Sequence, residues 1–194
     1  TGSIRVSGDL SDDTMNGGAD NDDFWGLGGN DTLNGAGGRD YLSGGMGNDT
    51  LNGGDGDDVL IGGAENDALN GGAGYDIVDY SYPTTILIGN VGVTVNLETG
   101  VGSGGAGADT FSGIEEIQGS DGDDIITGDG AANVIYARHG IDILSGGGGD
   151  DLLNAGAGGQ TGGARDIIKA VETANASIAT AISLTGAFDL ANNS

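Results

Sequence analysis

Apolar residues recur at an interval of nine along the first part of the chain. When the chain is cut from Gly8 onward, eight consecutive nine-residue segments each begin with Gly and carry an apolar residue at the eighth place. Polar residues occupy most of the flanking seventh and ninth places, which predicts a very short strand with one inward side chain. The five residues before each strand are rich in Gly and predict a turn. Each nine-residue segment, called a nonad below, is therefore predicted to be one turn followed by one strand, with these inward residues: Met15, Phe24, Leu33, Leu42, Leu51, Leu60, Leu69 and Val78.

The outward places repeat with a period of eighteen rather than nine. The hexapeptide NDTLNG stands at 30–35 and again at 48–53. Odd nonads carry Thr or Ala at place seven and Asn at place nine, whereas even nonads carry a more apolar set that includes Trp25, Tyr41, Val59, Ile61 and Ile77. One full coil is therefore predicted to take two nonads, which gives an all-β fold, a flattened solenoid of two parallel sheets. The even face would expose an apolar strip, and we expect something to cover it.

The remainder of the chain divides into three parts. The nonad frame lapses over residues 80–118, where alternating segments predict continued strands around an irregular loop at GSGGAGAD, residues 102–109. Nonads resume at Gly119 and continue to about residue 163. Apolar residues at steps of three and four then predict an amphipathic helix from about Arg165 to Leu184, suited to capping a solenoid or to connecting it to another domain. The predicted divisions are a first repeat block (1–79), an insert (80–118), a second repeat block (119–163) and a C-terminal helix with its tail (164–194).

Composition limits the classes of function. The 194 residues include 44 Gly and only 3 Phe, so an ordinary close-packed core is hard to build. Thirty acidic residues against five Lys and Arg give a net charge of −25, which argues against nucleic acid as a partner and for bound cations. No Cys is present for disulfides or zinc, and no apolar run of about 18 residues exists to span a membrane. The absence of a leader at the N-terminus indicates a mature chain or a fragment.

The sixth place of the nonads is acidic almost throughout. Coil stacking would bring Asp residues eighteen apart to about 4.8 Å from one another, where two unit charges repel by about 1 kcal/mol even in water. A divalent cation between them reverses the sign, and Ca²⁺ suits carboxylates combined with backbone carbonyls of Gly-rich turns. With one His and no Cys, softer metals have little to bind. The candidate metal ligands are Asp13, Asp22, Asp31, Asp40, Asp49, Asp58, Asp67, Asp76, Asp124, Asp142 and Asp151, while Asn133 replaces Asp in one nonad.

The segments GGMGNDTLN, GGDGDDVLI and GGAGYDIVD resemble the nonapeptide pattern GGxGxDxUx of the RTX family. That resemblance implies a calcium-loaded parallel β-roll of the kind found in bacterial proteins exported by type I secretion. It also implies that each ion takes two Asp side chains, carbonyls from places one and three of one turn, and carbonyls from places two and four of the next turn of like parity. One ion would then use Asp31 and Asp49 and another Asp40 and Asp58, with carbonyl ligands from Gly26, Gly28, Gly45 and Gly47 and from Gly35, Gly37, Gly54 and Gly56 respectively.

Other chemistry has weaker support. GSGGAG at 102–107 fits a dinucleotide-binding pattern, but no helix-forming run follows it. Glu115 and Glu116 are adjacent, so on a strand they face opposite sides and cannot act as an acid and base pair. His139 lies in a predicted turn without a Ser or Cys nucleophile arrangement. We therefore expect no enzymatic activity and no cofactor besides several calcium ions.

Two functional alternatives remain open from the sequence. The insert resembles a block that interrupts RTX arrays in large secreted adhesins and surface proteins, which favours a calcium-folded structural module of an adhesin, fibre or surface-layer protein that self-associates outside the cell. The alternative is the folding and secretion module of an exported protease, lipase or epimerase whose catalytic domain lies elsewhere. Flanking sequence carrying an H-E-x-x-H or G-x-S-x-G motif would favour the second alternative.

Overall fold

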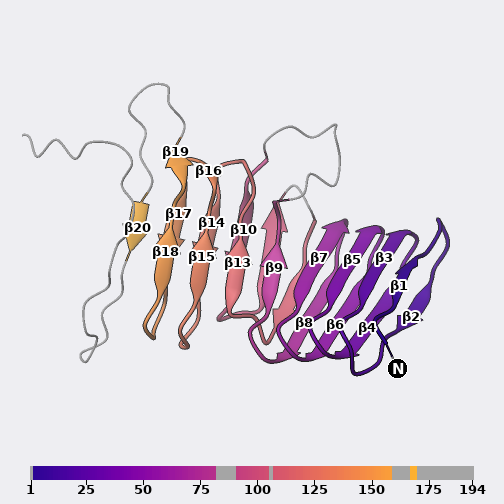
Figure 1. Ribbon diagram of the computed structural model, residues 1–194. Helices are drawn as coiled ribbons and strands as arrows, with labels where there is room; N and C mark the ends of the chain where they lie inside the picture. Colours follow the sequence, from indigo (N-terminus) through magenta and orange to yellow (C-terminus); the bar gives the residue numbers. More distant parts are fainter. Residues whose placement is uncertain (1, 82–90, 105–106, 159–166, 170–194) are drawn as a thin grey trace, which may run out of the picture.

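The computed structural model describes residues 2–81, 91–104, 107–158 and 167–169, and these form short strands joined by turns, with no helix among them. The strands make two long sheets that face each other, so that the chain runs from one sheet to the other and back once per coil (Figure 1). The first sheet contains β1 (Arg5–Ser7), β3 (Asp23–Gly28), β5 (Tyr41–Met46), β7 (Val59–Ala64), β9 (Ile77–Asp79), β13 (Glu116–Gln118), β15 (Val134–Tyr136) and β18 (Leu152–Asn154). The second contains β2 (Thr14–Asn16), β4 (Thr32–Gly37), β6 (Thr50–Asp55), β8 (Ala68–Ala73), β12 (Thr110–Ser112), β11 (Val101–Gly104), β10 (Val93–Asn96), β14 (Ile125–Thr127), β17 (Ile143–Ser145) and β20 (Ile167–Lys169). The predicted all-β parallel solenoid is confirmed.

The register of the coils is eighteen residues throughout the first block. Leu33 pairs with Leu51 and Leu42 pairs with Leu60, each with its chemical equivalent one coil away. These four side chains are fully buried between the sheets, and the eighth-place residues of both blocks form one continuous core with them. Burying each Leu stabilises the fold by about 1.5 to 3 kcal/mol, so a core only one residue wide per strand still carries the packing.

The insert keeps the first sheet in register but lengthens the second. In the first sheet β9 pairs directly with β13, and β13 with β15. In the second sheet β11 and β10 form an antiparallel pair that lies between β12 and β14. Two extra strands on one side add roughly 10 Å of sheet that the other side lacks. Consistent with this wedge, the strands of the first block slant relative to those of the second (Figure 1).

Aromatic and aliphatic side chains fill the wedge. Tyr80 and Phe111 meet edge to face with ring centroids 6.4 Å apart, and Phe111, Ile114, Val93 and Val95 are buried in the common core. Val93–Asn96, Thr110–Ser112 and Glu116–Gln118 are strands, as the alternation predicted. The predicted irregular loop at 102–109 is wrong in part, because Val101–Gly104 is a strand whose backbone pairs with β10 despite its Gly content.

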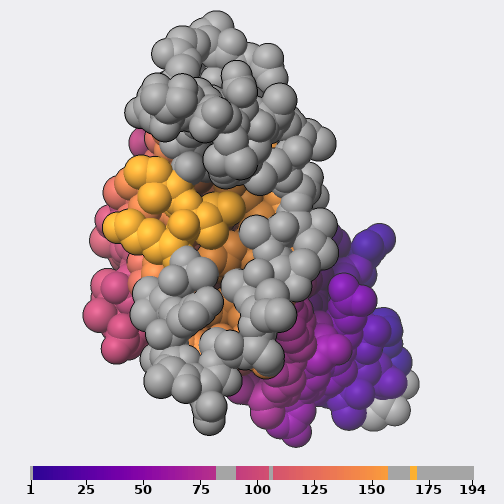
Figure 2. Space-filling model, turned by 90° about the vertical axis from the view of Figure 1, so that its left-hand side faces the viewer, coloured from indigo at the N-terminus to yellow at the C-terminus, as the bar shows by residue number. Residues whose placement is uncertain are grey.

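The C-terminal helix predicted from about Arg165 is wrong for Ile167–Lys169. These residues form β20, which pairs in parallel with β17 so that Ile143 faces Ile167. The edge of β17 offers unpaired backbone groups, and the Ile-Ile pair favours a strand. β20 lies at the opposite end of the roll from β1 and β2 (Figure 1), and Figure 2 looks onto that end. The rest of the predicted helix lies outside the described residues, and a small separate sheet pairs β16 (His139–Gly140) with β19 (Ala157–Gly158).

The two outer faces differ as the sequence predicted. On the odd face the amide of Asn34 donates to Asn16, at 2.9 Å, and the amide of Asn52 donates to Asn34, at 2.8 Å. On the even face Trp25 and Tyr41 contact each other with ring centroids 5.8 Å apart, and the Arg5 guanidinium lies 5.3 Å from the Trp25 ring. Arg5 thus covers part of Trp25, and Ile61 of the same strip is buried, while the covering of the whole strip stays a prediction. Within the described part of the chain there is no helix long and apolar enough to cross a membrane.

Candidate calcium sites

The sixth-place carboxylates form two ladders, one along each edge of the roll. From Asp31 to Asp76, each carboxylate accepts a hydrogen bond at Oδ1 from the backbone N–H of the sixth-place residue one coil earlier: for example, Asp31 donates to Asp49 at 2.8 Å, and Asp40 donates to Asp58 at 2.7 Å. This bond fixes the carboxylate in the gap between successive turns. The sequence-based prediction that Asp residues eighteen apart lie on a common edge is confirmed for the first block.

The second carboxylate oxygen of these residues has no hydrogen-bond partner. The Oδ2 atoms are buried without one in six described residues of the first block: Asp31, Asp40, Asp49, Asp58, Asp67 and Asp76. Burial raises the pKa of Asp49 to about 6 and that of Asp67 to about 8, because a charged carboxylate loses its hydration there; neighbouring carboxylates add to the effect. A row of buried, negatively charged oxygens without donors is unfavourable unless a cation binds it.

The turns supply backbone carbonyls beside each ladder. Places two and four have positive φ, for example 116° at Gly45 and 119° at Gly47. A side chain at Gly47 would also collide with the carbonyl of Gly29, the equivalent residue of the previous coil. Place one is tight for a different reason, since a Cβ at Gly44 would lie 2.6 Å from the Gly62 carbonyl oxygen and against Asp49 Oδ2. Carbonyl oxygens of successive turns therefore lie close to the unpartnered carboxylate oxygens.

A second row of side chains clamps the turns from place five, a role that the sequence reasoning missed. Here the bond runs in the opposite direction along the roll, because the side-chain oxygen accepts from the backbone N–H one coil later: Arg39 donates to Asn21 at 2.9 Å, and Asn48 donates to Asn30 at 2.8 Å. Asp57 holds the N–H of Tyr75 in the same way at 3.0 Å. The frequent Asn or Asp before the sixth-place Asp was the signal that could have revealed this clamp.

These groups fit a hard divalent cation. Among the described residues, no cluster of three or more His, Cys, Asp or Glu side chains could hold a metal ion. A cation between two coils would therefore take two carboxylates and complete its shell with backbone oxygens. Ca²⁺ accepts six to eight oxygen ligands in flexible geometry, whereas Mg²⁺ requires a stricter octahedron. The unpartnered Oδ2 atoms are the structural observation that supports such a site.

Comparison with known families agrees with this donor set. The family model of the RTX calcium-binding nonapeptide repeat matches four times, at residues 7–42, 43–78, 109–144 and 131–159, which together cover more than half of the chain. The chain belongs to this family. Its repeats make it a calcium-binding module, as the sequence resemblance indicated. No curated protein matches the chain at a significant level.

Within the RTX frame, the predicted ligands of the second block are less uniform than those of the first. Asp124 donates its N–H to Asp142 Oδ1 at 2.9 Å, and Asn133 donates to Asp151 Oδ1 at 2.9 Å, so both ladders resume after the insert. The structure places most of the predicted carbonyl ligands at the ends of the first-block strands rather than in turns: Gly26 and Gly28 lie in β3, Gly35 and Gly37 in β4, Gly45 in β5 and Gly54 in β6, whereas Gly47 and Gly56 lie just beyond β5 and β6. Their coordination of an ion stays a prediction.

Two further acidic residues continue the RTX ladders into the insert. Asp67 donates its N–H to Asp109 Oδ1 at 3.0 Å, and Asp76 donates to Glu115 Oε2 at 2.9 Å. The sequence reasoning did not place either residue in a ladder, because it searched for an unbroken frame of nine. The signal was present for Asp109, since ADTFSG at 108–113 repeats the pattern of NDTLNG at 30–35.

The odd ladder stops at Asp109. The Tyr80 hydroxyl donates to Asp109 Oδ2 at 2.6 Å, which occupies the oxygen that has no partner in the preceding coils. Beyond the hairpin, Val93 holds the position that precedes Asp124 and donates its N–H to Asp124 Oδ1 at 2.8 Å. An apolar residue at this position supplies no carboxylate, so the calcium ladders of the two RTX blocks are separate on this edge.

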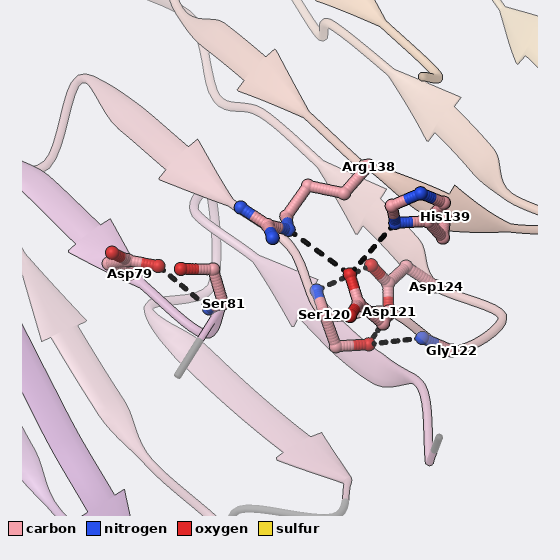
Figure 3. A network of polar contacts seen from close by, with 8 residues as sticks. All are labelled: Asp79, Ser81, Ser120, Asp121, Gly122, Asp124, Arg138 and His139. Atoms are coloured by element: carbon pink, nitrogen blue, oxygen red, sulfur yellow. Dashed lines mark hydrogen bonds and ion pairs between the residues drawn. The ribbon is translucent and has the colours of Figure 1, made fainter. Parts of the chain in front are cut away.

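The first turns of the second block contain a polar network (Figure 3). Ser120 Oγ donates to Asp124 Oδ1 at 2.6 Å, and the Ser120 N–H donates to Asp124 Oδ2 at 2.9 Å. On the outside of the same turn, His139 Nδ1 lies 3.0 Å from Asp121 Oδ1, and Arg138 Nε lies 3.3 Å from the same oxygen. The hydrogen bond from His139 and the Arg138 charge lower the pKa of Asp121. The turn predicted for His139 is wrong, because His139 lies in the short strand β16; its side chain contacts Asp121 of the preceding coil.

Proposed function

We propose that this chain is a calcium-binding structural module of a secreted bacterial surface protein, of adhesin, fibre or surface-layer type, that folds when calcium binds outside the cell. RTX repeats are typical of secreted or extracellular bacterial proteins. The module has no catalytic role in this proposal. Its stiffness comes from ions placed between successive coils, and it associates with other copies or with neighbouring surface proteins.

One observation carries the calcium-dependent folding. Six buried Oδ2 atoms in the first block have no hydrogen-bond partner, and they lie in ladders whose members are one coil apart. A chain with a net charge of −25 and so narrow a core does not overcome that repulsion by burial of one apolar residue per strand. Extracellular calcium modules bind at about 0.1 to 1 mM, far above free cytosolic calcium, so the same chain is unfolded before export and folded after it.

The experiment is a calcium titration of the full chain followed by far-ultraviolet circular dichroism, with calorimetry on the same samples. We expect little β signal in excess chelator, a cooperative gain of β structure on adding CaCl₂, and no equivalent gain with MgCl₂ at the same concentration. The magnesium arm separates ion-specific folding from general screening of charge. A full β spectrum in excess chelator would overturn the proposal.

A second candidate is the folding and secretion module of a type I-secreted protease, lipase or epimerase. The calcium ladders support it equally, because both candidates need a chain that folds only after export. The discriminating observation is the polypeptide on either side of this chain: tandem repeats or adhesion domains support the first candidate, and a catalytic domain supports the second.

Self-association is the part of the proposal that concerns surface assembly. Strand β1 leaves Val6 39% exposed, and the face beside it carries Trp25 and Tyr41. Light scattering of the parent and of a variant with Trp25→Ser and Tyr41→Ser, each with and without calcium, tests it. A calcium-dependent oligomer that the double variant weakens supports assembly through this face, whereas monomers throughout would contradict it.

A further inference from the structure

The first coil of each block closes its turns differently from the coils that follow. In these turns the backbone N–H at place two donates to the sixth-place side chain of the same nonad. The donors and acceptors are Asp9 to Asp13 Oδ2 at 2.9 Å, Gly18 to Asp22 Oδ2 at 2.9 Å, Ser120 to Asp124 Oδ2 at 2.9 Å, and Asp129 to Asn133 Oδ1 at 2.8 Å. We call these four turns closed and the turns before the six unpartnered Asp residues open.

The side chain at place two strengthens three of the four closed turns. Ser11 donates its N–H to Asp9 Oδ1 at 2.8 Å, and Ala131 donates to Asp129 Oδ1 at 2.8 Å. Gly122 donates in the same way to Ser120 Oγ at 3.0 Å, as Figure 3 shows. Place two therefore carries a short acceptor side chain in these three turns, and that side chain holds the place-four N–H.

Closed and open turns also differ in backbone conformation. Place two has positive φ in the open turns, including 78° at Leu27 and 79° at Ala36, where no Gly eases it. No place-two residue of the four closed turns has positive φ. The sign of φ at place two sets the direction of the peptide groups on either side of that residue. It therefore determines whether an N–H donor or a carbonyl faces the sixth-place carboxylate.

This difference decides where a cation is favoured. In an open turn, Oδ2 is buried without a donor, so a cation is the only charge that compensates it. In a closed turn, the positive end of an N–H dipole already points at that oxygen, and a cation at the same place would meet like charge. Asp124 has the fullest set of donors, since it accepts from Ser120 N, Ser120 Oγ and Val93 N.

Stacking explains why the closed form stands at the start of the second block. An open turn lies on the turn before it: a Cβ at Gly45 would fall 2.7 Å from the carbonyl carbon of Leu27, and one at Gly54 would fall equally close to that of Ala36. The turn 128–132 instead follows the three-residue connection between β12 and β13, which is Gly113, Ile114 and Glu115. That connection is too short to offer the carbonyls of places two and four, so the next turn satisfies its own sixth-place side chain.

We propose that the chain holds two separately started calcium ladders, each beginning with a coil whose closed turns bind no calcium, and that the insert restarts the second ladder. Calcium then enters only between open turns. This inference rests on the calcium binding of the proposed function and sharpens it, because it removes Asp13, Asp22 and Asp124 from the ligands that the RTX pattern alone assigns.

The test compares calcium bound per chain, by equilibrium dialysis at saturating CaCl₂, in the parent and in Asp13→Asn, Asp124→Asn and Asp49→Asn. Asp13→Asn and Asp124→Asn are expected to keep the parent number of ions, and Asp49→Asn is expected to lose one or two. Ser120→Ala is the matched control for the closed turn, expected to lower Tm in calcium while the number of ions stays the same.

The outcomes separate this inference from the proposed function. Loss of an ion from Asp13→Asn or from Asp124→Asn overturns the ion-free first coil even if Asp49→Asn fails to fold. A change in the ion number of Ser120→Ala overturns it as well. If the parent chain binds no calcium at all, the proposed calcium module itself is overturned. If the parent binds calcium but substitutions in the first and the later coils lose ions equally, only the ion-free first coil is overturned.

Discussion

Substitution of one turn glycine tests whether backbone conformation, rather than ligand identity, builds the calcium sites. Gly47 has a φ of 119°, and a Cβ there would collide with the Gly29 carbonyl. Gly47→Ala keeps the backbone carbonyl that the RTX pattern assigns as a ligand, so only conformation and close approach change. Positive φ costs a non-glycine residue about 1 to 2 kcal/mol, and relieving the collision brings the total to about 2 to 4 kcal/mol.

For a domain of 150 to 250 residues, each kcal/mol lowers Tm by about 2 to 4 °C, so Gly47→Ala is expected to lower Tm by about 4 to 16 °C in saturating calcium. Gly18→Ala is the matched control, because Gly18 stands in a turn of the same ladder system and a Cβ there meets nothing within 4 Å. Thermal unfolding followed by circular dichroism provides the measurement. Equal Tm values for the two variants would refute the assignment of strain to the stacked turns.

Three further predictions follow from the same structure. Burial raises the pKa of Asp40 and Asp76 to about 6 and that of Asp67 to about 8, so their stabilising contribution to the ion-free fold is present below about pH 4 and lost as pH rises to about 8; in chelator, β signal should therefore fall with rising pH. A β signal in chelator that stays constant between about pH 4 and 8 would contradict this. Leu42→Ala removes a fully buried side chain and should destabilise the calcium-bound fold by about 2 to 5 kcal/mol in denaturant unfolding, whereas Leu10→Ala, at a residue 77% exposed, should change it little. Tyr80→Phe leaves Asp109 Oδ2 without its donor and should cost about 1 to 3 kcal/mol in the same assay, and no loss would show that another group replaces the hydroxyl.

The repeat blocks were predictable from sequence because residues at the same place of each nonad have the same structural environment. Leu33, Leu42 and Leu51 lie at the same place of their nonads and are buried at the same depth, so a strict interval of nine is enough to locate the core. The interval of eighteen likewise predicted which residues pair, since Thr32 faces Thr50 and Asn34 faces Asn52. In such a fold the neighbours of a residue are copies of itself, and local pattern determines tertiary contact.

The insert and the C-terminal part were harder to predict because their contacts depend on partners outside the local pattern. Val101–Gly104 becomes a strand only because β10 offers an edge, and nothing in a Gly-rich tetrapeptide indicates that. Ile167–Lys169 misled the helix prediction because Ile recurs at helical steps further along the chain. Yet DIIK at 166–169 has the same pattern as DIIT at 124–127 and DILS at 142–145, which indicates a strand; Asp166 itself lies outside the described residues.

The candidate site likewise has one part that follows from the repeat sequence and one part that depends on contacts with the preceding coil. The sixth-place Asp residues could be predicted because charge repulsion at strand spacing follows from the repeat alone. Closed and open turns could not be predicted, since Gly18 has the residue that the RTX pattern expects at place two and still donates to Asp22. What the turn rests on, rather than its own sequence, decides which conformation it takes.

The glycine content of the chain is a consequence of the ladders and not of flexibility. Place one must be small because the carboxylate and a carbonyl of the next coil lie against it, and places two and four of the open turns have positive φ. Where a side chain is present at these places, φ is 75–79°, at Leu27, Ala36, Glu65 and Arg138, compared with 103–146° at the glycines that occupy places two and four of the open turns of the first block. The non-glycine residues thus adopt the left-handed helical minimum, while glycine extends past it and carries its carbonyl to a different orientation. Since the RTX pattern assigns two of the carbonyl ligands of each ion to places two and four, turns that contain Leu27 or Ala36 should bind calcium more weakly than turns that contain Gly at both places.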